Sequence, residues 1–208
     1  GMQGEGVIER FVFGLAGTTS LKTLDLSTNL IGSQDGKTTS SLSDALAGST
    51  NLEKLTLANN FIGIHSDSTG PAHLGTALKQ LVNLTELDLS GLEVVDEAMK
   101  TVLLGLQGMC KLRYLDLSAT LIGCSQASST ALAQILPNFT DLLSLNLTIG
   151  CFGFGGVENT VTFANALAQL HQLDTLFLEG NSIGLNGDAG LVALSNSIQN
   201  IKNLSLFT

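Results

Sequence analysis

The stretch LKTLDLSTNLIG, residues 21 to 32, decides the fold, because its leucine spacing returns six more times along the chain. Leu21, Leu24 and Leu26 form the pattern L-x-x-L-x-L, and further copies begin at Leu52, Leu84, Leu112, Leu142, Leu173 and Ile201. The intervals between successive starts are 31, 32, 28, 30, 31 and 28 residues. A pattern that returns at such intervals predicts structural units stacked on their neighbours.

Each unit changes its hydrophobic period half-way. The L-x-L core alternates, as expected for a strand with one buried face. The second half places apolar side chains at i and i+4, which is the inward stripe of an amphipathic helix; the pairs are Phe11/Leu15, Leu42/Leu46, Leu74/Leu78, Val102/Leu106, Leu132/Leu136 and Phe163/Leu167. In the last unit Ser195 interrupts this stripe, so Leu194 and Ile198 are expected to supply the packing.

These residues resemble the leucine-rich repeat family, and a repeat near 28 residues with an outer helix is similar to its ribonuclease-inhibitor-like subclass. The resemblance covers residues 7 to 208. It implies an α/β fold, a right-handed solenoid or horseshoe with a parallel sheet of about seven strands on the concave face and helices on the convex face. It also implies one domain over residues 1 to 208, in which residues 1 to 20 form a helical half-repeat and a partial repeat begins at 201.

The asparagine ladder of such repeats, whose side chains satisfy backbone groups in the turn beyond each strand, is matched at Asn29, Asn60 and Asn181. At the same position the third, fourth and fifth copies have Leu92, Thr120 and Gly150. Thr120 can form a similar hydrogen bond, whereas Leu92 and Gly150 have no side-chain group to offer. We therefore expect altered turns in the third and fifth copies.

Composition excludes several classes of partner. Hydrophobic residues make up 44% of the chain and charged residues 13%, as in a folded domain. Eighteen acidic against nine basic residues give a net charge of −9, which opposes binding to nucleic acid and to anionic membrane surfaces. No apolar run is long enough to span a bilayer, and the N-terminus does not resemble a secretory signal.

The three cysteines, Cys110, Cys124 and Cys151, are odd in number and have no C-x-x-C spacing. This usage fits a reducing compartment better than a disulfide framework, and we expect all three to be small buried apolar residues. The predicted location is the cytoplasm, or the interior of a host cell that a bacterial effector enters.

Two segments carry residues that bind ligands in other proteins. Residues 65 to 73, HSDSTGPAH, contain His65, Asp67 and His73, but the spacing matches no metal pattern, so we favour a solvated insertion over a metal site. Residues 150 to 156, GCFGFGG, follow a strand and precede a helix, where glycine loops cradle phosphates, but lack the lysine of a phosphate-binding loop. A loop that packs Phe152, and with it Phe154, is the better interpretation, and no cofactor is predicted.

Side chains beside and between the strand leucines alternate away from the core and are expected to form three columns on the concave face. The first column reads Thr23, Lys54, Glu86, Tyr114, Ser144, Thr175 and Asn203. The central column reads Asp25, Thr56, Asp88, Asp116, Asn146, Phe177 and Ser205. The third column reads Ser27, Ala58, Ser90, Ser118, Thr148, Glu179 and Phe207.

Two features distinguish this predicted face from an ordinary solvated sheet. Acidic side chains, which favour a partner with basic groups, are Asp25, Glu86, Asp88, Asp116 and Glu179. Tyr114, Phe177 and Phe207 are aromatic residues at outward positions, and exposed aromatics commonly anchor interfaces. The leading hypothesis is therefore a module without enzymatic activity that binds a protein or peptide, most strongly on the C-terminal half of this face.

A structural alternative remains open at this point. The chain ends directly after the strand that begins near Ile201, without a polar capping unit. Solenoid ends require a cap and open strand edges invite pairing. A self-associating solenoid, or a fragment of a larger repeat protein, would explain this end equally well.

Overall fold

The computed structural model describes residues 5–33, 36–63, 69–94, 96–185, 187–199 and 201–205. Strands and helices alternate along these residues. The strands are β1 (Thr23–Asp25), β2 (Lys54–Thr56), β3 (Glu86–Asp88), β4 (Tyr114–Asp116), β5 (Ser144–Asn146), β6 (Thr175–Phe177) and β7 (Asn203–Ser205). The helices are α1 (Glu5–Ala16), α2 (Gly36–Ala47), α3 (Thr69–Leu78), α4 (Asp96–Leu104), α5 (Gln126–Ile135) with the 3-10 turn η1 (Leu136–Asn138), α6 (Val157–Leu167) and α7 (Asp188–Ser197).

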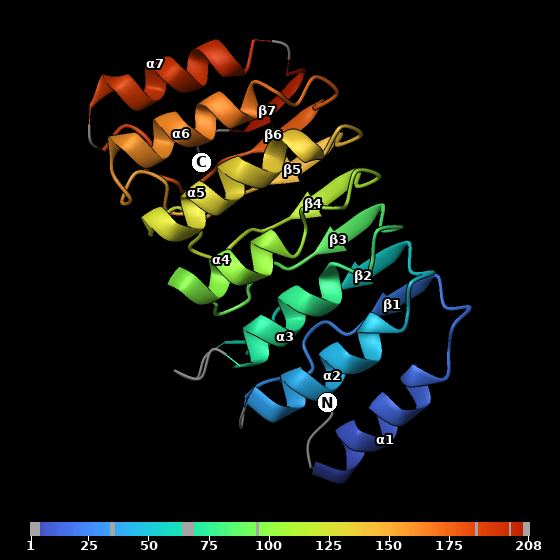
Figure 1. Cartoon of the computed structure of the whole chain (residues 1–208). Coiled ribbons are helices and arrows are strands. Elements are labelled where there is room, and N and C mark those ends of the chain that lie inside the picture. Colours follow the sequence, from blue (N-terminus) through green and yellow to red (C-terminus); the bar gives the residue numbers. More distant parts are fainter. Residues whose placement is uncertain are drawn as a thin grey trace.

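The seven described strands form one parallel sheet in sequence order, β1 to β7. Figure 1 shows the strands in one row, with the helices side by side along the opposite layer. The register places the middle residue of each strand beside the middle residue of the next, so Leu24, Leu55, Leu87, Leu115, Leu145, Leu176 and Leu204 form one line. The repeat pattern therefore predicted both the architecture and the register.

The core lies between the sheet and the helices. The predicted inward residues of α2 to α6 are buried, and Leu194 takes the packing role in α7 that Ser195 cannot. Each buried leucine contributes about 1.5–3 kcal/mol, and its neighbours belong to the units on either side. Contacts between successive units therefore dominate the stability of this fold.

The turns beyond the strands do not differ in the way we expected. In the fifth copy Ile149 and Cys151 have φ values of 57° and 65°, close to those of Thr28 and Leu30 in the first copy, 56° and 59°. In the third copy Gly91 has a φ of 64°, at the position where Asn59 of the second copy has 53°. The prediction of an altered turn is therefore wrong for the fifth copy. In the third copy the first left-handed position is unchanged, but residues 93–94 do not form the second turn that residues 62–63 and 122–123 form in other copies.

Hydrogen bonds explain why the fifth turn is unchanged. Asn181 of the sixth copy donates from Nδ2 to the carbonyl oxygen of Leu147, and its Oδ1 accepts from the N–H of Phe152 at 3.4 Å. A ladder asparagine thus serves the turn of the preceding unit as well as its own. Gly150 needs no side chain of its own, because Asn181 supplies these bonds from the next unit.

The cysteines also differ from expectation. All three are free thiols; Cys110 and Cys124 are exposed and Cys151 is half-buried. The prediction of buried cysteines is wrong because these residues lie in turns at the ends of the units, where burial depends on the neighbouring loop.

Among the described residues, no helix is long and apolar enough to span a membrane.

Candidate functional site

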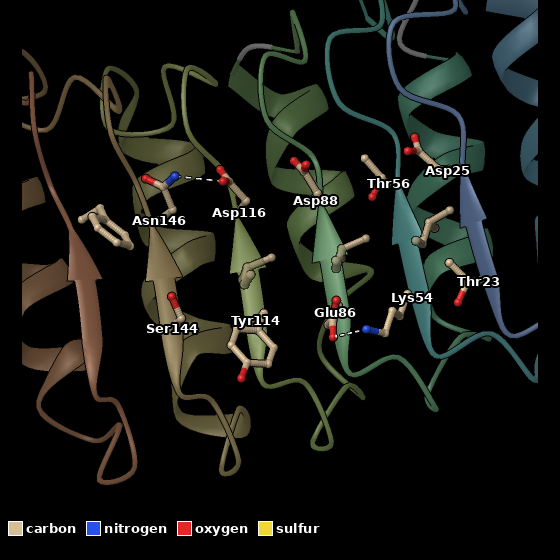
Figure 2. A pocket seen from close by; sticks show the side chains of 14 residues that line it. Thr23, Asp25, Lys54, Thr56, Glu86, Asp88, Tyr114, Asp116, Ser144 and Asn146 are labelled. Carbon is tan, nitrogen blue, oxygen red and sulfur yellow. Dashed lines mark hydrogen bonds and ion pairs between the residues drawn. The ribbon is translucent and has the colours of Figure 1, made fainter. Parts of the chain in front are cut away.

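The face of the sheet that points away from the helices forms a shallow groove of about 390 Å³. Its lining comes from strands β1 to β6 and includes six of the predicted site residues, Asp25, Glu86, Asp88, Tyr114, Asp116 and Phe177. Figure 2 shows five of these side chains, Asp25, Glu86, Asp88, Tyr114 and Asp116, projecting from neighbouring strands into the same space. We call this surface the groove.

Alternation along each three-residue strand puts these side chains in the groove. In β4 the middle residue, Leu115, is 2% exposed, while Tyr114 before it and Asp116 after it face outward. The pairing of Glu86 with Tyr114 and of Asp88 with Asp116 then aligns the first and central columns across strands. The first and central columns predicted from the sequence are therefore present in the structure, whereas Ala58 of the third column is buried.

Lys54 changes the electrostatics at the N-terminal end of the groove. Its Nζ lies 2.6 Å from Oε1 of Glu86 on the adjacent strand, and both side chains are partly exposed (Figure 2). A pair of this kind contributes only about 0–1 kcal/mol, but it neutralises one predicted acidic residue. The predicted first column already placed Lys54 beside Glu86, but the predicted site contained only acidic and aromatic side chains and therefore omitted Lys54.

The three aspartates of the central column each hold the turn beyond their own strand. Oδ1 of Asp25, Asp88 and Asp116 accepts a hydrogen bond from the backbone N–H two residues later, at 2.8 to 2.9 Å. The backbone N–H of Ser27, and then its side chain, lower the pKa of the Asp25 carboxyl from its ordinary value. The hydrogen bonds therefore fix all three carboxylates in position, and the lowered pKa keeps Asp25 ionised at neutral pH.

The free bonding capacity of the aspartates differs. Oδ2 of Asp116 accepts from the side-chain amide of Asn146 at 2.8 Å, a bond that Figure 2 marks. Asn146 Oδ1 in turn accepts from the N–H of Thr148. Within the described residues, no hydrogen-bond partner faces Oδ2 of Asp88, so Asp88 is more able than Asp116 to accept a bond from a ligand.

Two aromatic side chains lie in the C-terminal half of the groove. Tyr114 on β4 is 46% exposed and Phe177 on β6 is 38% exposed. Ser144 and Asn146 on β5 lie between them in the register. The outward orientation of both rings is confirmed.

Glu179, the other described residue of the predicted site, does not line the groove. Glu179 is half-buried in the turn after β6, where its carbonyl oxygen accepts from the N–H of Ile149. Phe207 lies outside the described residues, as do His65 and Asp67. His73 is an exposed residue of α3, and the described part of the chain has no group of three or more His, Cys, Asp or Glu side chains that could hold a metal ion.

The glycine-rich segment before α6 packs against its neighbours. Phe152 is fully buried, and its ring centroid lies 4.5 Å from that of Phe163, as the packing prediction required. Phe154 is 64% exposed, so the prediction that it packs as well is wrong. A Cβ on Gly153 would clash with the carbonyl oxygen of Ser182, so this glycine permits the close approach of two loops.

Cys124 and Cys151 occupy adjacent turns. Desolvation, and then a hydrogen bond with Cys151, raise the pKa of the Cys124 thiol to about 11, and the negative charge of Asp96 contributes in the same direction. At neutral pH this thiol is protonated, although the residue is exposed. A protonated thiol is a poor nucleophile and a poor metal ligand, which argues against a reactive role.

Comparison with known proteins identifies the fold but not the activity. Neither a protein-family model nor a curated protein matches this sequence. The C-terminal domain of tropomodulin from Caenorhabditis elegans matches with a TM-score of 0.58 and 16% identity, over 79% of this chain and 93% of that one. The leucine-rich repeat-containing protein LegL7 from Legionella pneumophila matches with a TM-score of 0.57 and 20% identity, over 95% of this chain and 68% of that one.

Proposed function

We propose that this chain, which has the leucine-rich repeat fold, is a module without enzymatic activity that binds a protein or peptide in the groove. One observation carries this proposal: the sheet presents two exposed aromatic side chains and a line of fixed carboxylates on one continuous surface. Aromatic residues are frequent anchors of protein interfaces, and carboxylates favour a partner with basic groups.

The dimensions of the groove favour a chain-like or protein partner over a compact small molecule. Its lining runs from Thr23 on β1 to Phe177 on β6, which is five strand spacings. At about 4.8 Å per spacing the groove is roughly 24 Å wide. A volume of about 390 Å³ spread over this width fits an extended segment that crosses the strands.

Charge divides the groove into two halves. At the N-terminal end the ion pair of Lys54 with Glu86 leaves little net charge in the first column. Asp88 and Asp116 lie side by side in the central column, with Tyr114 in the first column of the same strand as Asp116. We therefore place the basic groups of the partner at Asp88 and Asp116, with Tyr114 and Phe177 as the aromatic anchors.

The double substitution Tyr114→Ala with Phe177→Ala tests this proposal. Proteins recovered by the wild-type chain from a cell extract would be compared with those recovered by the double variant. The affinity of each purified candidate would then be measured by calorimetry. We expect a loss of at least about tenfold, since anchor residues typically contribute 2 kcal/mol or more.

The matched control is Phe13→Ala, because Phe13 lies on α1, is 85% exposed, does not line the groove and is remote in sequence from Tyr114 and Phe177. It should recover the same proteins as the wild type. Equal affinity of the double variant and the wild type for every purified candidate would contradict the assignment of the groove as the binding site.

A second function, self-association through β7, has one observation in its favour. Leu204 is 39% exposed, whereas the leucines at the same position of β2 to β6 are 0 to 2% exposed. Among the described strands β7 is also an edge of the sheet, and open edges favour pairing. Light scattering over a range of concentrations distinguishes the two functions, because a monomer at every concentration argues against self-association.

Several finer assignments belong to the same proposal. The repeat lengths and the outer helices favour the ribonuclease-inhibitor-like subclass. A scaffold in the cytoplasm and an effector delivered into a host cell would both use the groove in the same way. The free cysteines are compatible with the reducing interior that both roles require.

A further inference from the structure

Four large apolar side chains are exposed on the turns that follow the last three inner strands. Leu121, Ile149, Phe154 and Leu185 are 45%, 51%, 64% and 60% exposed. They follow β4, β5, β5 and β6, so they occupy one end of the strands in three successive units. We call these four residues the apolar rim.

Hydrogen bonds between the turns bring the apolar rim together. Ala119 and Gly123 donate their N–H groups to the carbonyl oxygens of Thr148 and Gly150, at 2.8 and 2.6 Å. In the next pair of turns, the N–H groups of Ile149 and Gly153 donate to Glu179 and Asn181, both at 2.8 Å. Figure 1 shows the turns after β4, β5 and β6 side by side along one edge of the sheet.

The apolar rim also adjoins the groove. Ile149 lies three residues beyond Asn146, which pairs with Phe177 in the register of β5 and β6. A Cβ on Gly180, three residues after Phe177, would lie 3.2 Å from Cγ1 of Ile149, so the side chain of Ile149 covers the turn that leaves β6. A partner in the C-terminal half of the groove therefore meets the apolar rim at Ile149.

Ile149 is a large apolar residue at a turn position that the repeat holds in the left-handed region. Its φ is 57°, and Thr28, Asn59, Gly91, Ala119 and Gly180 at the same position of other units have φ values of 53° to 67°. β-Branched residues rarely adopt this region. About half of the Ile149 side chain is exposed, so it presents an apolar surface beside the groove.

Charge restricts what can cover the apolar rim. No lysine or arginine occurs between residues 114 and 201, whereas the strand ends, turns and helix starts on the side of the rim carry four acidic residues, Asp116, Glu158, Glu179 and Asp188. A second copy of this surface would bring like charges together, and an anionic lipid surface would be repelled. Charge complementarity therefore favours a protein partner whose apolar contact surface is bordered by lysine or arginine.

We propose that the apolar rim is the second half of the binding surface, and that a partner with basic and apolar side chains contacts the groove and the rim together. This inference rests on the proposed function of the groove. It adds a surface outside the concave face and specifies the apolar chemistry of the partner.

The probe is a library of random peptides of about twelve residues displayed on phage, long enough at about 3.3 Å per residue to cross the groove and reach the rim. Peptides enriched on the wild-type chain would be synthesised, and their affinities measured for Phe154→Ser with Leu185→Ser, the rim variant. The control is Phe13→Ser, which removes an exposed phenylalanine on α1. Light scattering tests whether a second copy of the chain covers the rim. Binding to vesicles of phosphatidylcholine with phosphatidylserine tests whether a lipid surface covers it.

The expected result is enrichment of peptides that combine lysine or arginine with large apolar residues. Their affinity should fall at least about tenfold on the rim variant and remain unchanged on Phe13→Ser. Peptides that bind the rim variant as tightly as the wild type overturn the proposal. An absence of enriched peptides also overturns it. The same holds if the wild-type chain dimerises and the rim variant does not, or if the wild-type chain binds vesicles and the rim variant does not.

The groove variant, Tyr114→Ala with Phe177→Ala, separates the two proposals. Loss of binding on the groove variant alone overturns the role of the rim and leaves the groove in place. Loss on the rim variant alone overturns the groove assignment instead.

Ile149→Asn is expected to change thermal stability and peptide affinity in opposite directions. We expect the Tm to rise by about 2–4 °C, because asparagine tolerates the left-handed conformation, while peptide affinity falls. A variant whose Tm and affinity are both unchanged would overturn the role of Ile149.

Discussion

At the scale of single residues, the same amino acid at the same repeat position has different roles in this chain. Asn60 is 1% exposed, and its Nδ2 donates to the carbonyl oxygens of Leu26 and Leu57. Its Oδ1 accepts from the N–H groups of Asn29 and Ile31. Among the described residues no strand precedes β1, and Nδ2 of Asn29 donates to the carbonyl oxygen of Ser27.

This difference predicts unequal costs for two identical substitutions. Asn60→Ala removes the partner of several buried backbone groups, each of which costs about 1–3 kcal/mol when left unpaired. We expect a loss of about 3 kcal/mol or more in the free energy of unfolding, measured by urea denaturation. Asn29→Ala should cost less than about 1 kcal/mol. Equal losses for the two variants would contradict the ladder as described.

At the scale of an element, the loop between β5 and α6 is held by one of its two phenylalanines. Phe152 packs inward on Phe163 of α6, whereas Phe154, two residues later, points into solvent. The sequence shows two aromatic residues in a glycine-rich stretch and no period that separates them. The close approach of Gly153 to Ser182 of the next loop fixes which ring is buried.

Phe152→Ala is expected to cost about 3–5 kcal/mol, because the buried ring leaves a cavity between loop and helix. Phe154→Ala should stay within about 0.5 kcal/mol, since its ring is exposed. Chemical denaturation of both variants provides the measurement. Comparable destabilisation by the two substitutions would show that the loop is anchored differently.

At the scale of the whole molecule, stability depends on neighbours on both sides of each unit. Leu115 and Leu204 occupy the same position in β4 and β7, but Leu115 is 2% exposed and Leu204 is 39% exposed. Leu115 lies between β3 and β5, whereas β7 pairs with β6 alone among the described strands. The position of a unit in the stack, rather than its local sequence, sets this difference.

Leu115→Ala should therefore cost about 2–5 kcal/mol of unfolding free energy, and Leu204→Ala less than about 1 kcal/mol. Hydrogen exchange would locate the effect, with opening across the central units for the first variant and at β7 for the second. A large loss from Leu204→Ala would imply that β7 is covered in solution, as self-association requires.

The sequence by itself determined the repeat, the parallel order, the register and the columns of outward side chains, because leucine spacing and strand alternation are local properties of each unit. Tertiary structure decided which side chains meet between units: the pair of Lys54 with Glu86, the bond of Asn146 to Asp116, the exposure of the cysteines and the position of the apolar rim. These contacts join residues about thirty positions apart in sequence, and their geometry depends on the separation and tilt of adjacent turns, which no single repeat encodes.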